Sequence, residues 1–325
     1  MFIYDTEQKI FDIAGLKIGG QPGEVPTVMA GTIFYAGHKI VEDDVKGIID
    51  EKSAEELINK QDEMSDITGN PAIIQIFAEA SEAMERYIEF CTKISDSPFL
   101  IDSTDASARI AGTKYVQEVG LTDKAVYNSL NVSCTPEEME ALKDSDISSS
   151  IVLGFNPKDA SVSGKVELLD TGAGLVDKGL LDLSEDLGIT KPLIDPASMP
   201  IGAGAGSSVA SGFVIKSKFG VPVGLGIHNA PSSWVWLKEY RRAHAEHPER
   251  GVWIGEGGDV YRFCDIGSNV VPIIAGQDFV LYGPIENAAI AFPLCAMADI
   301  IVSEANQVEH GITPIESHPY FKMSE

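Results

Sequence analysis

Carboxylate and carboxamide side chains stand at the ends of five strongly apolar runs in this sequence. They are Asp102, Asn128, Asn156, Asp195 and Asn229. An aspartate can accept two N–H donors side by side, and an amide offers both a donor and an acceptor. The combination suits a neutral, planar, nitrogen-rich ligand such as the pyrimidine edge of a pterin, and a buried aspartate without such partners would be costly. We therefore expect these side chains to gather around one ligand.

Further polar residues lie near the ends of other apolar runs. His228 ends the seventh run, and Tyr35, His38, Tyr282 and Glu286 lie at or beyond the ends of the first and the last. His228 and Glu286 are therefore additional candidates for the site. Metal ligands would need more His, Asp or Glu at close spacing, and no GxSxG or cysteine-centred motif ends a run. The sequence thus predicts neither a metal site nor covalent catalysis.

The apolar runs themselves predict the scaffold that brings these residues together. Most are continuously apolar, as expected for parallel strands buried on both faces. The eight runs are 27–35, 71–77, 97–103, 124–130, 148–155, 191–197, 222–229 and 278–284. Helical patterns separate them, so the sequence predicts an α/β fold, a (β/α)8 TIM barrel, preceded by a short N-terminal hairpin over 9–18. The rival is a doubly wound open sheet, whose GxGxxG fingerprint is missing after the first strand.

Apolar stripes and capping signals predict where the helices lie. Thr135-Pro136-Glu137-Glu138 is a capping box with proline at the first helical position. We expect helices over 81–95, after Thr135, after a cap at Ser232 or Ser233, and over 286–306, the last containing Pro293. Another expected helix has Leu180, Leu183 and Leu187 on its apolar stripe and ends at Gly188. A further one has Val209, Phe213 and Val214 on its stripe and ends at Gly220.

Two glycine-rich segments interrupt this pattern, and both belong to the single domain that we expect residues 1–325 to form. IGAGAGS (201–207) lacks the GK[ST] ending of a phosphate loop, so we interpret it as a flexible loop, with a weak anion site at the next helix as the alternative. The polar stretch 239–263 is interpreted as a surface excursion that could act as a lid or contact a partner.

The composition restricts the partners and the compartment. The 325 residues include 24 basic and 49 acidic side chains, for a formal net charge of −25. Such a surface repels nucleic acids and anionic lipids, so we expect no nucleic-acid partner. No continuous apolar run reaches the about 18 to 20 residues of a membrane-spanning helix, so we expect no direct membrane insertion. The first residues lack a signal-peptide pattern and the four cysteines are scattered, which predicts a cytoplasmic protein with reduced, buried thiols.

Longer stretches of the chain resemble a known family. LIDST (100–104), VYNSLN (126–131), IVLGFN (151–156), PLIDPA (192–197) and GIHNAPS (226–232) resemble the strand ends of the pterin-binding methyltransferase barrels, which include methyltetrahydrofolate:corrinoid methyltransferases and dihydropteroate synthases. A more specific resemblance, over nearly the whole chain, is to the H-subunit family of the tetrahydromethanopterin S-methyltransferases. It is carried by IGGQPGE (18–24), GTIFYAGHKIV (31–41), MSDITGNPAIIQIF (64–77), DFVLYGPIEN (278–287) and ESHPYFK (316–322).

This resemblance implies a pterin-dependent corrinoid methyltransferase of methanogenesis and one-carbon metabolism. The substrate would be N-methyl-tetrahydromethanopterin, whose methyl group passes to cobalt(I) of a cobamide carried by a partner subunit. The protein would be a homodimer, cytoplasmic, and peripheral to the membrane through other subunits of a membrane methyltransferase complex. By matching motifs, Asp102, Asn128 and Asp195 would hold the pterin ring, Asn156 would line the same pocket, and Asn229 would lie near the methyl-bearing nitrogen.

The implied reaction has one difficult step. Cobalt(I) is a strong nucleophile, but a tertiary amine is a poor leaving group, so its nitrogen needs a proton or a strong hydrogen bond in the transition state. Asn229 can donate that hydrogen bond, and Asp102 or an ordered water could relay the proton. His228 is the alternative donor.

Three other functions stay open at this point. The protein could be a methylcobamide:tetrahydrofolate methyltransferase of the same family, because both pterins share the ring. It could be a non-catalytic barrel subunit of a membrane complex. It could also be a dihydropteroate synthase, although its strand-end loops carry little of the positive charge that pyrophosphate binding needs.

Overall fold

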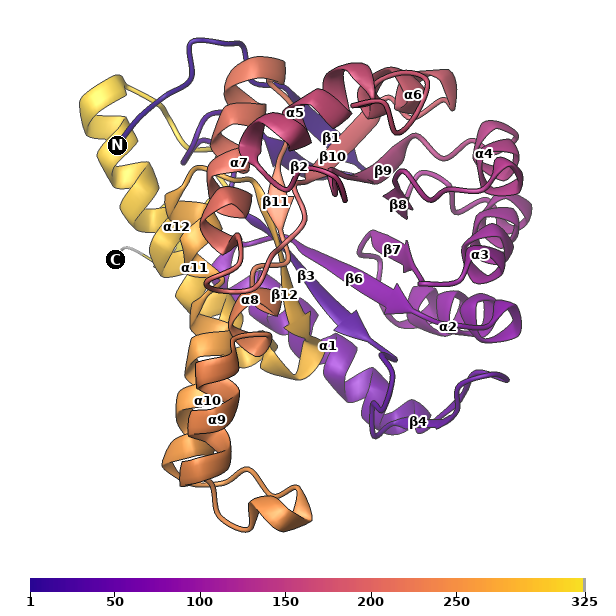
Figure 1. Ribbon diagram of the computed structural model, residues 1–325, viewed down its shortest axis with the longest axis vertical. Coiled ribbons are helices and arrows are strands. Elements are labelled where there is room, and N and C mark those ends of the chain that lie inside the picture. Colours follow the sequence, from indigo (N-terminus) through magenta and orange to yellow (C-terminus); the bar gives the residue numbers. More distant parts are fainter. Residues whose placement is uncertain (324–325) are drawn as a thin grey trace.

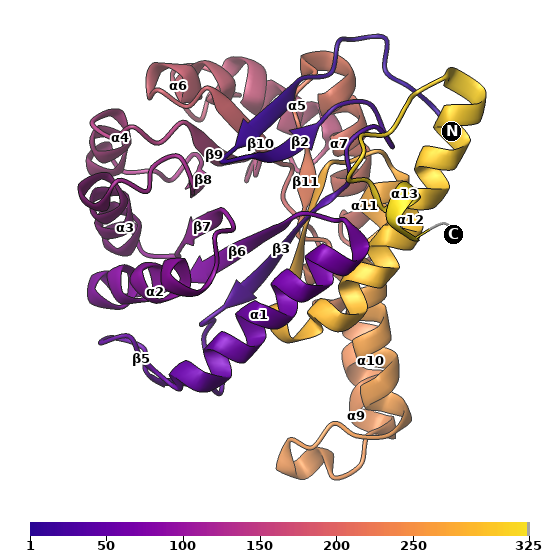
Figure 2. The ribbon, with the colours of Figure 1, turned by 180° about the vertical axis from the view of Figure 1, so that it is seen from behind.

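Eight parallel strands form one sheet in the computed structural model, which describes residues 1–323. Their order is β10-β9-β8-β7-β6-β3-β12-β11, and helices surround them (Figures 1 and 2). The strands are β3 (Val28–Ile33), β6 (Ala72–Phe77), β7 (Phe99–Asp102), β8 (Ala125–Leu130), β9 (Ser149–Leu153), β10 (Lys191–Asp195), β11 (Gly224–Leu225) and β12 (Phe279–Pro284). Each lies within one of the eight predicted runs, so the predicted strands are confirmed.

The two edge strands of this sheet meet and close it into a barrel. Ile194 of β10 forms a parallel bridge with Val223, which directly precedes β11. The backbone N–H of Ile194 also donates to the carbonyl of Pro222 at 2.9 Å. The (β/α)8 barrel is therefore confirmed. We call the junction between β10 and the two-residue strand β11 the seam of the barrel.

Alternation along the strands explains why the runs are continuously apolar. One set of side chains points into the barrel and forms a cluster, while their neighbours pack outward against the helices. The inward cluster includes Val28, Ala30, Ile73, Leu100, Val126, Ile151, Leu193 and Phe279. Because both faces of each strand are buried, neither face tolerates a regular pattern of polar residues.

The predicted N-terminal hairpin is present and closes one end of the barrel. It consists of β1 (Ile10–Ile13) and β2 (Leu16–Gly19), which pair antiparallel around Ala14 and Gly15. Its residues Ile13, Leu16 and Ile18 belong to the same cluster as the inward-facing strand residues. The hairpin lies at the end from which the barrel strands start, opposite their arrowheads (Figure 2). A second small pair, β4 (Val41–Asp43) and β5 (Ile48–Ile49), lies in the connection after β3.

The helices follow most of the predicted boundaries. The Thr135 capping box is formed in full, and Gly220 ends its helix in the left-handed conformation as expected. The helices are α1 (Glu51–Thr68), α2 (Ser81–Ile94), α3 (Ala106–Val119), α4 (Pro136–Lys143), α5 (Val162–Thr171), α6 (Leu180–Asp186), α7 (Ala205–Phe219), α8 (Asn229–Ser232), α9 (Val235–His244), α10 (Glu256–Gly267), α11 (Val270–Ile274), α12 (Ala288–His310) and α13 (Pro319–Met323), with short 3-10 turns at Pro248–Arg250 and Ile285–Asn287.

Two details of the helix predictions are wrong. The inner face of α7 is formed by small and polar residues with Ile215, whereas Phe213 and Val214 are exposed. Phe213 instead packs against Phe2 and Tyr4, with ring centroids 5.3 Å apart in each pair, so a segment distant in sequence covers it. Helix α9 is preceded by Trp234 and has no side-chain cap, because Ser232 belongs to the separate helix α8.

Helix α12 is both long and apolar. By length and mean hydropathy alone, the segment Ile285–His310 could cross a membrane, and within residues 1–323 it is the one helix of that kind. Half of its most apolar window is buried. Asp299 on this helix accepts hydrogen bonds from the N–H and hydroxyl of Thr27, at 3.0 and 2.7 Å, just before β3. These contacts make α12 part of the outer layer of the barrel.

The stretch 239–263, expected as a surface excursion, belongs to a helical hairpin. Helices α9 and α10 pack side by side and extend away from the barrel at the bottom of Figure 1. We call residues 234–263 the α9–α10 hairpin. The glycine-rich segment 201–207 forms a turn followed by the start of α7.

A buried ion pair ties the seam strands together. The ammonium of Lys216 on α7 is fully buried and contacts Asp278, directly before β12. Asp278 also accepts a hydrogen bond from the backbone N–H of Val223 at 2.8 Å, and Lys216 donates to the carbonyl of Gly20 at 3.0 Å. The pair therefore links α7, the entry to β11, the entry to β12 and the N-terminal hairpin.

We expect Lys216→Met to destabilise the barrel strongly. Removing one partner of a buried pair leaves an uncompensated charge and typically costs about 3–5 kcal/mol. Chemical denaturation measures the change, and Lys178→Met serves as the control because the Lys178–Asp186 pair lies on the surface. The double variant Lys216→Met/Asp278→Asn should recover part of the loss. A Lys216→Met protein as stable as the control would show that the pair does not hold the seam.

Candidate active site

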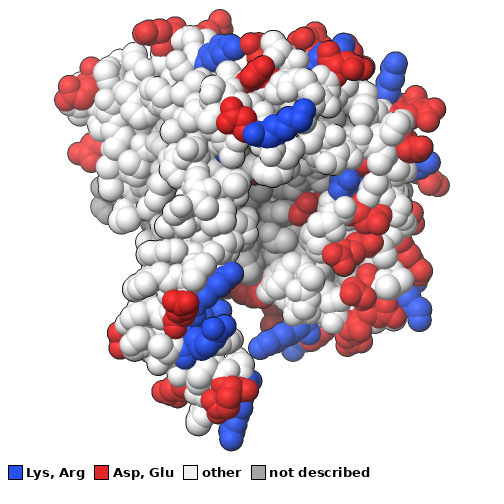
Figure 3. Space-filling model, in the orientation of Figure 1, with Lys and Arg blue, Asp and Glu red and all other residues white. Residues whose placement is uncertain are grey.

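The five predicted carboxylates and amides all lie on the rim formed by the carboxyl ends of the strands. Asp102 and Asn128 are direct neighbours across β7 and β8, and Asp195 is the last residue of β10. Asn156 follows β9 by three residues, and Asn229 begins α8 just after β11. Parallel strands direct these residues to one end of the barrel. Figure 3 shows that the surface is hollowed between the barrel and the α9–α10 hairpin on this side.

A chain of hydrogen bonds across three strands holds Asp102. The amide nitrogen of Gln75 on β6 donates to Asp102 Oδ2 at 2.6 Å, and the hydroxyl of Thr32 on β3 donates to Gln75 Oε1 at 2.9 Å. Burial raises the pKa of Asp102 to about 6, although Gln75, the positive charge of Arg109 and the Ser103 N–H act in the opposite direction. The chain leaves Asp102 Oδ1 without a side-chain donor among the described residues.

The loop after Asp102 is fixed by a buried ionic network. Arg109 on α3 donates to the carbonyl of Ser103 and to Glu138 on α4, the latter at 2.8 Å. Tyr127 on β8 donates to the same carboxylate at 2.6 Å. Glu138 is also the glutamate of the Thr135 capping box, so its second oxygen accepts the Thr135 N–H at 2.9 Å. One carboxylate thus connects the ends of β7 and β8, where Asp102 and Asn128 lie.

Asp195 is buried above a lysine that, among residues 1–323, has no ion-pair partner within contact distance. Its Oδ1 accepts the Ala197 N–H at 2.8 Å, and the Gly226 N–H also donates to this carboxylate. Burial raises the pKa of Asp195 to about 6, against these hydrogen bonds and the charge of Lys165. The fully buried Lys165 ammonium donates to Ala197 O and Ser208 Oγ, each at 3.1 Å, and burial lowers its pKa.

Asn156 and Asn128, which lie near the ends of β9 and β8, differ in their side-chain hydrogen bonds. Asn156 is buried, accepts the N–H groups of Lys158 and Asp159 at 2.9 and 3.0 Å, and donates to the carbonyl of Gly164 at 2.9 Å. Its side chain therefore shapes its own loop. Asn128 is half-buried and forms no side-chain hydrogen bond within the part of the chain that the structure describes, so its amide is available to a ligand.

His228 and Asn229 lie together at the end of β11. Asn229 is exposed, and its Nδ2 donates to the carbonyl of Gly226 at 3.1 Å, which leaves its second N–H and its oxygen open to a ligand. His228 is largely buried, and its Nδ1 lies 3.9 Å from Asp265 on α10. Burial lowers the pKa of His228 to about 4. A Cβ on Gly283 would lie 2.9 Å from His228 Nδ1, so β12 needs a glycine there.

Glu286 belongs to a second polar group on the same rim. It accepts a hydrogen bond from Tyr35 at 2.6 Å and lies 3.1 Å from His38 Nε2. Nδ1 of the buried His38 accepts the Phe34 N–H at 3.1 Å, so the proton of a neutral ring is on Nε2 and faces Glu286. Burial raises the pKa of Glu286, but the hydrogen bonds from His38 and Tyr35 outweigh it, so this pKa lies below its usual range.

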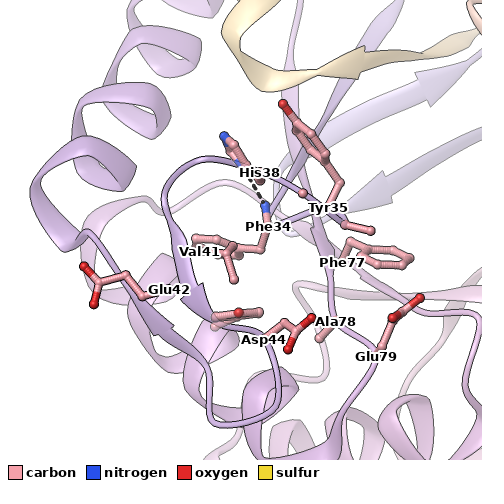
Figure 4. A pocket seen from close by; sticks show the side chains of 12 residues that line it. Phe34, Tyr35, His38, Val41, Glu42, Asp44, Phe77, Ala78 and Glu79 are labelled. Carbon is pink, nitrogen blue, oxygen red and sulfur yellow. Dashed lines mark hydrogen bonds between the residues drawn. The ribbon is translucent and has the colours of Figure 1, made fainter. Parts of the chain in front are cut away.

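Tyr35 and His38 of this group border a pocket at the ends of β3 and β6. Figure 4 shows Tyr35 and His38 at its upper side, Phe77 at its wall, and the carboxylates of Asp44 and Glu79 at its lower edge. Tyr282, which the sequence also nominated, is fully buried on the outer side of β12 and donates to Gln61 on α1 at 2.6 Å. It therefore does not reach the rim.

Several functional neighbours were missed by sequence reasoning. Thr32 and Gln75 are polar residues inside apolar runs, and this interruption was the available signal. Lys165 and Asp265 lie on helices and gave no signal, because only the folded chain brings them to Asp195 and His228. Among residues 1–323 there is no group of three or more His, Cys, Asp or Glu residues that could hold a metal ion. Cys91, Cys134 and Cys295 are buried, Cys264 is partly exposed, and all four are unpaired.

The fold places the chain in the class of (β/α)8 barrels, whose functional residues commonly lie at the carboxyl ends of the strands. Among solved structures, the chain is similar to a dihydropteroate synthase of Yersinia pestis, with a TM-score of 0.57 and 12% identity over 92% of this chain and 98% of that one. A Xanthomonas albilineans dihydropteroate synthase, in complex with indole-2-carboxylic acid and 6-chloroguanine, gives a TM-score of 0.51 and 17% identity over 93% and 98%. At such identities the similarity concerns the fold alone.

Sequence relatives are much closer. The family model of the tetrahydromethanopterin S-methyltransferase MtrH subunit matches residues 6–315, and the chain belongs to this family. The H subunit of the tetrahydromethanopterin S-methyltransferase of Methanothermobacter thermautotrophicus is 54% identical over 323 residues, which are 99% of this chain and 100% of that protein. The corresponding protein of Methanocaldococcus jannaschii is 51% identical over the same shares. The resemblance noted in the sequence motifs is thereby confirmed.

The raised pKa of Asp195 predicts a specific pH dependence of stability. Because its pKa is about 6 in the fold and 3.8 for an isolated aspartate, the folded state binds more protons between pH 4 and 6. Stability therefore falls as the pH rises through this window. In Asp195→Asn this contribution is missing, so its stability relative to the unaltered protein should rise by up to about 3 kcal/mol from pH 4 to pH 7, at about 1.4 kcal/mol per pKa unit.

Thermal or chemical unfolding at both pH values measures this difference. Asp102, Asp299 and the other buried acids are present in both proteins, so their contributions cancel. A difference that stays constant between pH 4 and 7 would contradict the raised pKa.

Proposed function

We propose that this chain is a methyltransferase subunit that transfers the methyl group of N-methyl-tetrahydromethanopterin to cobalt(I) of a corrinoid held by a partner subunit. Membership of the family of a tetrahydromethanopterin S-methyltransferase subunit supports the methyltransferase activity and its part in methanogenesis. The observation that carries the pterin site is that Asp102 lies directly opposite Asn128 on the neighbouring strand, on the same rim as the buried Asp195. Residues 1–325 act in this proposal as one pterin-binding barrel domain.

The buried carboxylates are suited to the pyrimidine edge of a pterin. A ligand that brings an amino group and a ring N–H supplies the donors that a buried carboxylate lacks, and each such charge-assisted bond is stronger than a neutral one. Asp195 already has two backbone donors, which orient it without neutralising it. Asn128 supplies a matching donor and acceptor. Asn156 contributes by fixing the loop after β9, since its own polar atoms are engaged there.

Proton supply to the leaving nitrogen is assigned to Asp102, directly or through a water. Its pKa of about 6 keeps a useful fraction protonated near neutral pH, which favours a general acid. His228 is the weaker candidate, because a pKa near 4 leaves its ring neutral at such pH values. Asn229 assists by a hydrogen bond to the methyl-bearing nitrogen that strengthens as the transition state forms. No atom of the barrel is methylated in this scheme, because the methyl group passes from nitrogen to cobalt in one displacement.

The same family membership supports an assembly in which the chain acts as a subunit of a larger methyltransferase complex. We further propose that the chain lies in the cytoplasm, peripheral to the membrane. A homodimer is part of this proposal. The partner subunits carry the cobamide, and this chain binds tetrahydromethanopterin as its substrate.

We expect Asp195→Ala and Asn229→Ala to affect different kinetic constants. Loss of a charge-assisted hydrogen bond to the pterin ring should raise KM for N-methyl-tetrahydromethanopterin about 10- to 100-fold in Asp195→Ala. Loss of a bond that matters mainly in the transition state should lower kcat by a similar factor in Asn229→Ala, with little change in KM. Steady-state methyl transfer to free cob(I)alamin measures both constants.

Asp186→Ala is the matched control, because Asp186 is an exposed aspartate on α6. Unchanged pterin affinity in Asp195→Ala would refute its role as an anchor. Methyl-tetrahydrofolate is tested beside the methanopterin donor, and faster transfer from folate would overturn the assignment of the pterin. No transfer from either donor, together with no calorimetric binding of methyl-tetrahydromethanopterin, would indicate a non-catalytic subunit.

A further inference from the structure

The α9–α10 hairpin differs from the rest of the chain in composition. It contains all three tryptophans of the protein, Trp234, Trp236 and Trp253, and four of its six arginines. Its five acidic and five basic side chains cancel, whereas the whole chain has a net charge of −25. Tryptophan, tyrosine and arginine are the residues most enriched where proteins bind one another.

Aromatic rings form a continuous row along α9. The ring centroids of Trp234 and Trp236 are 4.8 Å apart, those of Trp236 and Tyr240 are 5.2 Å apart, and those of Tyr240 and His244 are 4.1 Å apart. The spacing of four residues from Trp236 to Tyr240 to His244 keeps this row on one side of the helix. Trp236 is 49% exposed, so the row is open to solvent at that point.

Further apolar side chains of the hairpin are exposed to solvent. Val235 is 66% exposed, and Ile254 and Phe263 are each 62% exposed. The exposed basic residues Lys238, Arg242 and Arg262 lie on the same two helices. Figure 3 shows basic side chains gathered on the hairpin, on its side toward the hollow. Exposed apolar groups rimmed by charge mark an interaction surface.

The hairpin is built as a rigid arm. The guanidinium of Arg241 lies between the rings of Trp253 and Tyr261, 4.2 and 4.3 Å from their centroids. A Cβ on Gly257 would lie 2.7 Å from the carbonyl of Arg241, so the two helices approach closely there. A surface that is already ordered loses little entropy when a partner binds.

Its position indicates what it binds. The hairpin extends past the rim at which the strands of the barrel end, beside a hollow in the surface (Figures 1 and 3). Helix α10 continues beyond the hairpin to the rim, where its Asp265 lies 3.9 Å from His228. A corrinoid that stays bound to its protein can reach the pterin only when that protein stands over this rim, next to the hairpin.

We propose that the α9–α10 hairpin is the docking arm for the corrinoid-bearing partner, a proposal that rests on the function given above. The partner presents an acidic face with an apolar centre. Its acidic groups meet Lys238, Arg242 and Arg262, and its apolar centre covers Trp236 and Phe263. This contact orients the cobalt toward Asn229 without any part in the chemistry of the pterin.

The test compares binding of the partner with methyl transfer to free cob(I)alamin. The variant is Trp236→Ala/Arg242→Glu, and neither residue belongs to the pterin site. The control is Val308→Ala/Lys178→Glu, which makes the same kinds of change at an exposed apolar residue of α12 and an exposed lysine before α6. Affinity is measured by biolayer interferometry with the purified corrinoid-bearing subunit, in the full-length proteins.

We expect the hairpin variant to bind the partner about 10- to 100-fold more weakly than the control, since central aromatic and arginine residues contribute most to such interfaces. Added salt should weaken binding of the unaltered protein more than that of the variant. Transfer to free cob(I)alamin should stay within about twofold of the control. Absence of that transfer in the unaltered protein would refute the proposed function, while the affinity comparison would still decide the docking proposal.

Unchanged affinity of the hairpin variant would overturn the docking proposal. So would a change of oligomeric state in light scattering with partner affinity retained, because the hairpin would then bind a second copy of this chain. Equal loss of affinity in the variant and the control would also overturn it, because the effect would then come from the overall surface.

Discussion

Closure of the barrel at its shortest strand is the constraint on which the rest of the molecule depends. β11 contributes two residues to the sheet, and a single bridge joins its entry to β10. The buried Lys216–Asp278 pair holds the entries to β11 and β12 together from outside the sheet. At Gly224, a Cβ would lie 2.2 Å from the ring of Phe279, so the strand can approach β12 only without a side chain. Asp195 and Asn229 lie on either side of this seam, and their relative position depends on it.

Two aspartates on the rim, Asp102 and Asp195, lower the stability of the fold when they are ionised. Asp102 and Asp195 are held where burial raises their pKa to about 6, and such groups cost folding free energy when they are ionised. Hydrogen bonds from Gln75, Ala197 and Gly226 offset part of that cost and orient the carboxylates. A ligand that brings further N–H donors would supply the remainder. In the proposed pterin site, the same burial that weakens the fold prepares these groups to bind a polar ring.

Much of the architecture could be predicted from local patterns, while the support of the site could not. Continuous apolar runs located all eight strands, because a strand between a packed interior and a helix layer must be apolar on both faces. The common position of the strand-end residues could be predicted because the carboxyl ends of parallel strands lie at the same end of a barrel. Lys165, Gln75 and Asp265 were missed because their role depends on partners 27 or more residues away. The stripe of α7 was misjudged for a similar reason, since Phe2 and Tyr4 cover Phe213 from a distant part of the chain.

The N-terminal hairpin has a consequence for the order in which the molecule forms. Residues 10–19 are synthesised well before Leu193 and Phe279, which belong to the same inward-facing cluster as the hairpin. The backbone N–H of Lys9, directly before the hairpin, donates to the carbonyl of Gly220. This hydrogen bond also joins the region to a part of the chain that is distant in sequence. Contacts of such long sequence separation form slowly. The hairpin can therefore pack fully against the barrel only after β12 has been synthesised, and this packing closes that end of the barrel.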